Sequence, residues 1–82
     1  MNLRQLEYLV ALGAEGSFGR AAARCNASQP AVSVAIAKLE AELGVELVRR
    51  ESRGTALTPP GESLVRWARE ALASVEGLTV EA

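Results

Sequence analysis

Apolar residues recur at helical spacing through the first part of this 82-residue chain. A first helix is predicted from about residue 3 to residue 14, on the spacing of Leu3, Leu6, Leu9 and Val10. Ser17 is a good N-cap for a short second helix. Ala21 and Ala22 give that second helix a face of small side chains, against which another helix can approach closely.

A tight turn is predicted at residues 25–27, followed by a third helix up to Gly44. Asn26 tolerates the left-handed backbone that such a turn needs. Ser28 is the expected N-cap, and Pro30 fits the first turn, where a missing N–H costs nothing. The apolar stripe of this helix spans about 60° and consists of Val32, Ile36, Leu39 and Leu43.

Residues 45–58 have the pattern of a β-hairpin. Two short runs rich in branched or apolar residues, 45–50 and 55–58, flank a turn at residues 51–54. Arg53 therefore lies at the expected tip, and Pro59-Pro60-Gly61 closes the hairpin.

The last segment is predicted to be helical from about Gly61 to at least Val75. Its apolar residues alternate at spacings of four and three, which is typical of a coiled-coil seam. An isolated helix of this length is marginal in water, so a second copy of the chain is the expected cover. The expected dimer contacts are Leu64, Trp67, Ala68, Ala71, Val75 and Leu78.

The composition narrows the possible chemistry, because the chain has one cysteine, Cys25, and no histidine. Disulfide frameworks, Cys/His zinc sites and Ser-His or Cys-His nucleophile pairs are excluded. No apolar run reaches the roughly 20 residues of a membrane span, and the N-terminus lacks a signal-peptide pattern. We expect a soluble cytoplasmic protein that is not an enzyme, with no cofactor or metal, in which Cys25 is an inert small hydrophobe.

The net charge of −1 permits nucleic-acid binding without demanding it. Residues 1–61 carry seven basic and six acidic side chains, whereas residues 62–82 carry two basic and four acidic ones. The acidic excess therefore lies in the last segment. Binding to DNA depends on where the cations cluster. Arg49, Arg50 and Arg53 form such a cluster, because they fall within five residues.

The predicted order is helix, helix, short turn, helix, hairpin and long helix. Two helices joined by a turn of about three or four residues can present the second helix to the DNA major groove. The hairpin would be a wing whose basic tip could enter a minor groove. We expect a mainly α fold, with a winged helix-turn-helix at residues 1–60 and a dimerisation linker helix at residues 61–82.

Individual residues resemble the signature of the LysR family of bacterial transcriptional regulators. The strongest run is Ser28-Gln29-Pro30-Ala31-Val32-Ser33, followed by Ile36, Leu39-Glu40, Glu42-Leu43-Gly44 and Leu47. Further matches are Leu6, Leu9, Gly16-Ser17-Phe18, Ala21-Ala22, Arg50, Arg53, Leu57-Thr58 and Gly61. The resemblance spans about residues 1–75.

The resemblance implies sequence-specific binding to an inverted-repeat promoter site, with the last helices of two subunits paired antiparallel. Gln29, Pro30 and Ser33 would lie on the recognition helix, Arg50 would pair with phosphate, and Arg53 would contact the minor groove. Ser17 and Ser28 would cap helices whose N-termini face phosphates. The expected DNA contacts are Ser17, Arg20, Ser28, Gln29, Pro30, Ser33, Val34, Lys38, Arg50, Arg53 and Gly54. Alternatives stay open for Arg20, which could simply solvate a helix face, and for Arg50, which could pair with Glu46 or Glu51.

The chain departs from the family where polar or basic residues are common, at Val34, Ala35, Ala37 and Ala56. Val34 points away from the core stripe, and we hypothesise that it reads thymine methyl groups. The sparse charge predicts modest affinity, because non-specific binding depends on phosphate neutralisation.

In the family an effector-sensing domain follows the last helix, and only through it would a small molecule act. We expect this chain to be an isolated DNA-binding fragment or a naturally short form, located at the nucleoid in the bacterial cytoplasm. A tetramer of the full-length protein remains open. The rival function is a protein-interaction module that binds a partner through Val34, Ala37 and Ala41, and an enzyme is a distant third.

Overall fold

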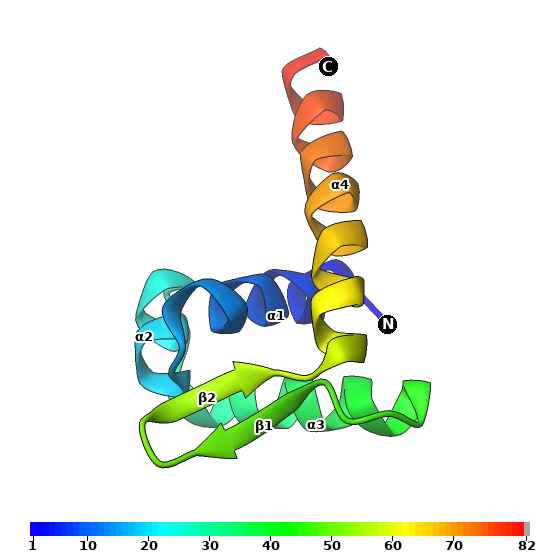
Figure 1. Ribbon diagram of the computed structural model, residues 1–82. Helices are drawn as coiled ribbons and strands as arrows, with labels where there is room; N and C mark the ends of the chain where they lie inside the picture. The colour runs from blue at the N-terminus through cyan, green and yellow to red at the C-terminus, as the bar shows by residue number, and fades with distance from the viewer. Residues whose placement is uncertain (82) are drawn as a thin grey trace.

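The computed structural model describes residues 1–81, and this part of the chain forms four helices and one hairpin (Figure 1). The mainly helical winged helix-turn-helix with a long final helix is confirmed. In chain order the elements are α1 (Leu3–Glu15), α2 (Phe18–Arg24), α3 (Gln29–Leu43), β1 (Val48–Glu51), β2 (Gly54–Leu57) and α4 (Pro59–Glu81).

Side-chain caps fix the starts of the first three helices. Ser17 Oγ accepts the Arg20 N–H at 3.1 Å and Ser28 Oγ accepts the Ala31 N–H at 3.2 Å, as the sequence predicts for α2 and α3. Asn2 makes a full capping box with Gln5 at the start of α1, which the sequence reasoning did not identify.

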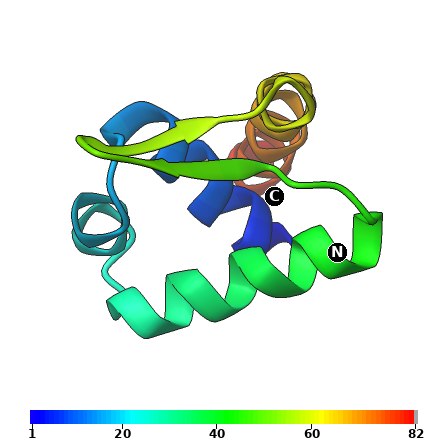
Figure 2. The same cartoon turned by 60° about the horizontal axis from the view of Figure 1, so that its bottom comes forward.

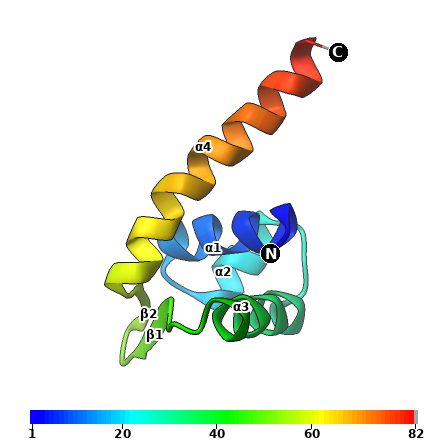
Figure 3. The same ribbon diagram turned by 90° about the vertical axis from the view of Figure 1, so that its right-hand side faces the viewer.

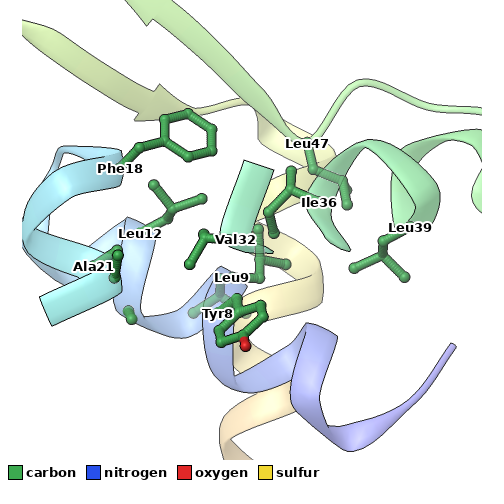
Figure 4. Close-up of a cluster of buried hydrophobic side chains, with 12 residues drawn as sticks. Tyr8, Leu9, Leu12, Phe18, Ala21, Val32, Ile36, Leu39 and Leu47 are labelled. Atoms are coloured by element: carbon green, nitrogen blue, oxygen red, sulfur yellow. The ribbon is translucent and has the colours of Figure 1, made fainter. Parts of the chain in front are cut away.

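The hydrophobic core is built around α1, against which α2, α3 and α4 pack (Figure 4). Its most completely buried large side chains are Leu9, Leu12, Val32, Leu39 and Leu47. The predicted stripe of α3 is buried at Val32, Ile36 and Leu39, whereas Leu43 is 38% exposed. Leu43 lies in the last turn of α3, where it borders an open apolar groove.

The hairpin pairs Val48 with Leu57 and Glu51 with Gly54, so its first strand begins three residues later than the sequence pattern predicts. The carboxylate of Glu40 explains the difference. Its Oε2 accepts the backbone N–H of Leu47 at 2.8 Å and that of Val48 at 3.3 Å. A side chain of α3 therefore takes up these donors and attaches the start of the wing to the third helix.

The tip of the hairpin is attached to the end of α1. The Thr55 N–H donates to the carbonyl oxygen of Gly16 at 2.9 Å. Gly54 has φ +121°, and a Cβ there would collide with the same carbonyl. Only glycine fits this close backbone approach without strain.

Thr58 joins the wing to α4. Its hydroxyl donates to the carbonyl of Glu46 at 2.6 Å and accepts the N–H of Gly61 at 3.1 Å. The α4 helix begins at Pro59 and projects from the body, with its later turns uncovered (Figures 1 and 3). Among residues 1–81, no helix is both long and apolar enough to cross a membrane.

Candidate nucleic-acid interface

The third helix and the hairpin lie on one side of the molecule, and the free end of α4 points away from that side (Figures 1 and 3). Figure 2 brings this side forward, with α3 and the hairpin both in view. Most of the residues that the sequence singled out for DNA contact belong to these two elements. The fold therefore assembles one composite face from segments that are separate in sequence.

The outer surface of α3 is exposed and largely apolar. Gln29, Pro30 and Lys38 are exposed, and Val34 is 53% exposed. Ser33 is half-buried, because it faces the groove between α3 and β1. The orientation expected from the core stripe thus holds, with Lys38 the one cation of this helix.

A narrow groove of about 210 Å³ separates α3 from β1. It is lined by Phe18, Ser33, Ile36, Ala37, Glu40, Val48 and Arg50. The guanidinium of Arg50 lies over the Phe18 ring, 4.7 Å from the ring centroid. Ser33 and Arg50, predicted as separate DNA contacts, therefore share one groove.

Two acidic residues near Arg50, Glu40 and Glu46, are engaged elsewhere, and Glu51 makes no ion pair with it in the described part of the chain. Glu46, one of the partners considered for Arg50, instead pairs with Arg49, whose Nε lies 3.8 Å from its carboxylate. Glu40 is held by the two backbone donors of the wing. Within residues 1–81 the side chain of Arg50 has no carboxylate at ion-pair distance, so its charge is available to a phosphate.

At the tip of the hairpin, Arg53 is exposed in the two-residue turn before Gly54. The need for glycine at position 54 is explained by the close approach of the Gly16 carbonyl, independently of any contact with DNA. Because the hairpin is attached at Gly16 and at Glu40, the tip has a fixed position relative to α3.

Both arginines of the second helix are engaged with Glu15. Arg20 donates to the carbonyl oxygen of Glu15 at 2.6 and 3.2 Å, and Arg24 lies 3.4 Å from the Glu15 carboxylate. Ser17 is half-buried as the cap of α2. Arg20 is thus held at the end of α1, by a partner that the sequence reasoning did not foresee.

A second hollow, of about 500 Å³, lies between the start of α1 and the outer side of α3. It is lined in part by Asn2, Arg4, Pro30, Val34 and Lys38. Sequence reasoning gave Arg4 no role, although its spacing from Tyr8 is that of neighbours on a helix. The Arg4 side chain donates to Tyr8 Oη at 3.0 Å and to the carbonyl of Cys25 at 3.3 Å, and the bond to Tyr8 raises the pKa of Arg4. Arg4 therefore ties α1 to the turn before α3.

The apolar residues of α4 form two stripes, and α1 covers one of them. Ala68 is 1% exposed and Val65 is buried on the same side, where α4 packs on α1. Ala68 was expected at the dimer contact, and the structure corrects this, because the residue is buried within its own chain. The spacing of apolar residues alone could not show that Ala68 packs on α1, because the adjoining stripe of α4 is also largely apolar.

The uncovered stripe of α4 follows a four-three-four spacing through Trp67, Ala71, Ser74 and Leu78, with Ser74 as its polar member. Trp67 is 67% and Leu78 70% exposed, Ala71 between them is half-buried, and Leu64 is half-buried at the edge of the stripe. The stripe continues into an apolar groove of about 310 Å³ beside the end of α3, lined by Leu43, Val45, Leu47, Pro60, Ser63, Leu64 and Trp67.

Residues 3–62 match the family model described as bacterial regulatory helix-turn-helix protein, lysR family. The hydrogen peroxide-inducible genes activator of Pectobacterium carotovorum is 51% identical over 78 residues, which are 95% of this chain and 26% of that protein. The chain thus spans about a quarter of the length of this relative.

Solved structures agree in fold and in sequence. The crystal structure of a BenM_DBD/catB site 1 DNA complex has a TM-score of 0.93 and 38% identity, covering 99% of this chain and 91% of that one. Full-length OxyR C199D from Pseudomonas aeruginosa has a TM-score of 0.90 and 46% identity, covering 96% of this chain and 27% of that one.

Proposed function

Because the chain belongs to the LysR family of bacterial regulatory helix-turn-helix proteins, we propose that it binds an inverted-repeat promoter site as a homodimer. Its winged helix-turn-helix is a double-stranded DNA-binding domain of a transcription regulator, and its relatives are regulators and not enzymes. The observation that carries the proposal is the composite face, on which α3 with its exposed outer surface and the hairpin with the exposed Arg53 at its tip lie on the same side of the molecule.

On this face, α3 would enter the major groove and the wing would reach the adjacent minor groove. Gln29 and Ser33 are the polar candidates for base edges, and Val34 offers an apolar contact to thymine methyl groups. Arg53 is the candidate for the minor groove, because an exposed arginine at a fixed tip suits its negative potential.

Phosphate contacts would flank these base contacts. Within residues 1–81, Arg50 and Lys38 pair with no carboxylate, and they lie on either side of the exposed face of α3. The N-terminus of α3, capped by Ser28, favours an anion, and Pro30 removes one of its amide donors. Ser17 and Arg20 are weaker candidates, since both are already engaged at the junction of α1 and α2.

Dimerisation would use the uncovered stripe of α4. We assign Trp67, Ala71 and Leu78 to the contact, with Leu64 and Val75 at its edge, and the functional division stays at residues 1–60 and 61–82. Ala82 itself lies outside the described residues. Antiparallel pairing through Ala71 would bring each Leu78 to the partner's groove beside Leu64, which would cover both exposed apolar surfaces.

An effector would act through a C-terminal domain beyond this chain, and tetramers would depend on that domain too. No cofactor or metal is proposed for residues 1–82.

Selection of the purified chain against randomised DNA duplexes, followed by sequencing, tests the proposal. A two-fold symmetric motif would support specific binding by a dimer and would give the half-site spacing. A single half-site would keep DNA binding but refute stable dimerisation of this chain alone. Absence of enrichment at low salt, with the chain shown to be folded, would refute DNA binding.

The rival is a protein-interaction surface on the outer side of α3, favoured by the exposure of Val34, Ala37 and Ala41. Salt distinguishes the two functions. DNA binding weakens steeply as salt rises, because counterions compete for phosphates, whereas an apolar protein contact changes little.

A further inference from the structure

Phe18 has an unusual position for a core residue. It is the first residue of α2, directly after the cap Ser17, and is only 8% exposed. Its ring packs in the hydrophobic core (Figure 4), yet it also lines the groove between α3 and β1, where the Arg50 guanidinium lies over it at 4.7 Å. One aromatic ring thus belongs both to the core and to the candidate DNA face.

The guanidinium of Arg50 lies over the Phe18 ring, and a guanidinium held in this way can keep its binding edges free. A guanidinium is planar, so one of its faces can rest on an aromatic ring while its N–H groups, which lie in the plane, stay available. Those N–H groups form the bidentate contact with a phosphate. A lysine at this position would keep the charge but lose the planar stack and the fork.

From this geometry we propose that Phe18 is a positioning residue, which holds Arg50 at the mouth of the α3–β1 groove to bind a DNA backbone phosphate. The inference rests on the proposed function and deepens it. A long arginine side chain loses rotamer freedom when it binds a ligand. Stacking on Phe18 removes part of that freedom before DNA arrives, and it aims the charge beside Ser33 of the recognition helix.

A double-mutant cycle tests this role, with the affinity for a selected duplex measured by fluorescence anisotropy. We expect Phe18→Leu to weaken binding by about two- to fivefold in the wild-type background, the range of an exposed cation–π contact. In an Arg50→Ala background the same substitution should have no effect. Phe18→Tyr and Phe18→Trp, which keep an aromatic face, should restore affinity.

NMR of the free chain supplies a readout that a purely structural role would not move. The ring current of Phe18 should shift the Arg50 side-chain protons upfield, and the shift should vanish in Phe18→Leu but persist in Phe18→Trp. If Phe18→Leu does not fold, Phe18→Met keeps the apolar volume without the aromatic face and replaces it in the cycle.

Tyr8 offers the matched control, because Arg4 lies over its ring at 4.9 Å and Tyr8 is also buried. Tyr8→Leu should destabilise the fold without any coupling to Arg50→Ala. Equal weakening by Phe18→Leu in both Arg50 backgrounds would overturn the positioning role, as would no weakening at all. Failure of the wild-type chain to bind any duplex would instead refute the proposed function.

Discussion

Glu40 is the side chain that should most clearly reveal how the wing is held on the recognition helix. Glu40→Ala removes the acceptor of the Leu47 and Val48 N–H groups, bonded at 2.8 and 3.3 Å. An unsatisfied buried donor costs about 1–3 kcal/mol, and both sites are only partly buried, so we take the lower part of the range for each. The expected loss of unfolding free energy is therefore about 2–3 kcal/mol.

For a domain of this size, 1 kcal/mol corresponds to about 4–8 °C in Tm, so Glu40→Ala should unfold about 10–20 °C below wild type. Differential scanning calorimetry measures the shift directly. Glu40→Gln retains an acceptor, so it should lose less unfolding free energy than Glu40→Ala. Its bonds to the two N–H groups are still made, although they are no longer charge-assisted. DNA affinity measured well below the Tm should also fall in Glu40→Ala, because the wing would no longer be fixed to α3.

Glu42→Ala is the matched control on the same helix. Glu42 is exposed, and among residues 1–81 it pairs with the terminal ammonium of Met1 alone, so its removal should cost about 0–1 kcal/mol. If Glu40→Ala and Glu42→Ala melt at the same temperature, the two backbone hydrogen bonds do not hold the wing, and the reasoning is wrong.

Three further predictions concern the interface and the dimer. Val34→Ala should abolish a thymine preference at one position of the selected motif, and an unchanged motif would rule out methyl readout by Val34. Arg53→Ala should weaken binding across all sequences and reduce the slope of log affinity against log salt by about 1, so an unchanged slope would argue against a DNA contact at the tip. Leu78→Glu should convert a dimer to a monomer in analytical ultracentrifugation. The control Arg69→Glu changes an exposed residue outside the uncovered stripe and should leave the dimer intact. A dimeric Leu78→Glu variant would exclude this stripe as the contact.

Much of the fold could be predicted because its signals are local. Ser17 and Ser28 cap helices by bonding to amides three residues ahead, and Gly44 ends α3 with a left-handed backbone. The burial of Val32, Ile36 and Leu39 follows from helical periodicity. Each of these signals lies within a few residues, so no knowledge of the tertiary structure was needed.

The sequence could identify the individual candidate DNA contacts, but it could not predict how they are arranged in space. Periodicity indicated that Val34 points outward, and the turn pattern placed Arg53 at a tip. Neither could reveal that Arg50 rests on Phe18 or that Arg20 is held by the carbonyl of Glu15, because these contacts join different elements. Charge counting likewise could not indicate which arginines keep free charge after folding.

The sequence by itself determined the order of the elements, the caps at Ser17 and Ser28 and the outward side of α3, since hydrogen bonding and periodicity act along the chain. The tertiary structure alone decided which of two largely apolar stripes on α4 is covered by α1, burying Ala68 and leaving Trp67 and Leu78 exposed. It also fixed the wing through Glu40 and the Gly16 carbonyl. The physical reason is the same in each case: a helix or hairpin specifies its own faces, but the angle at which elements cross decides which face finds a partner.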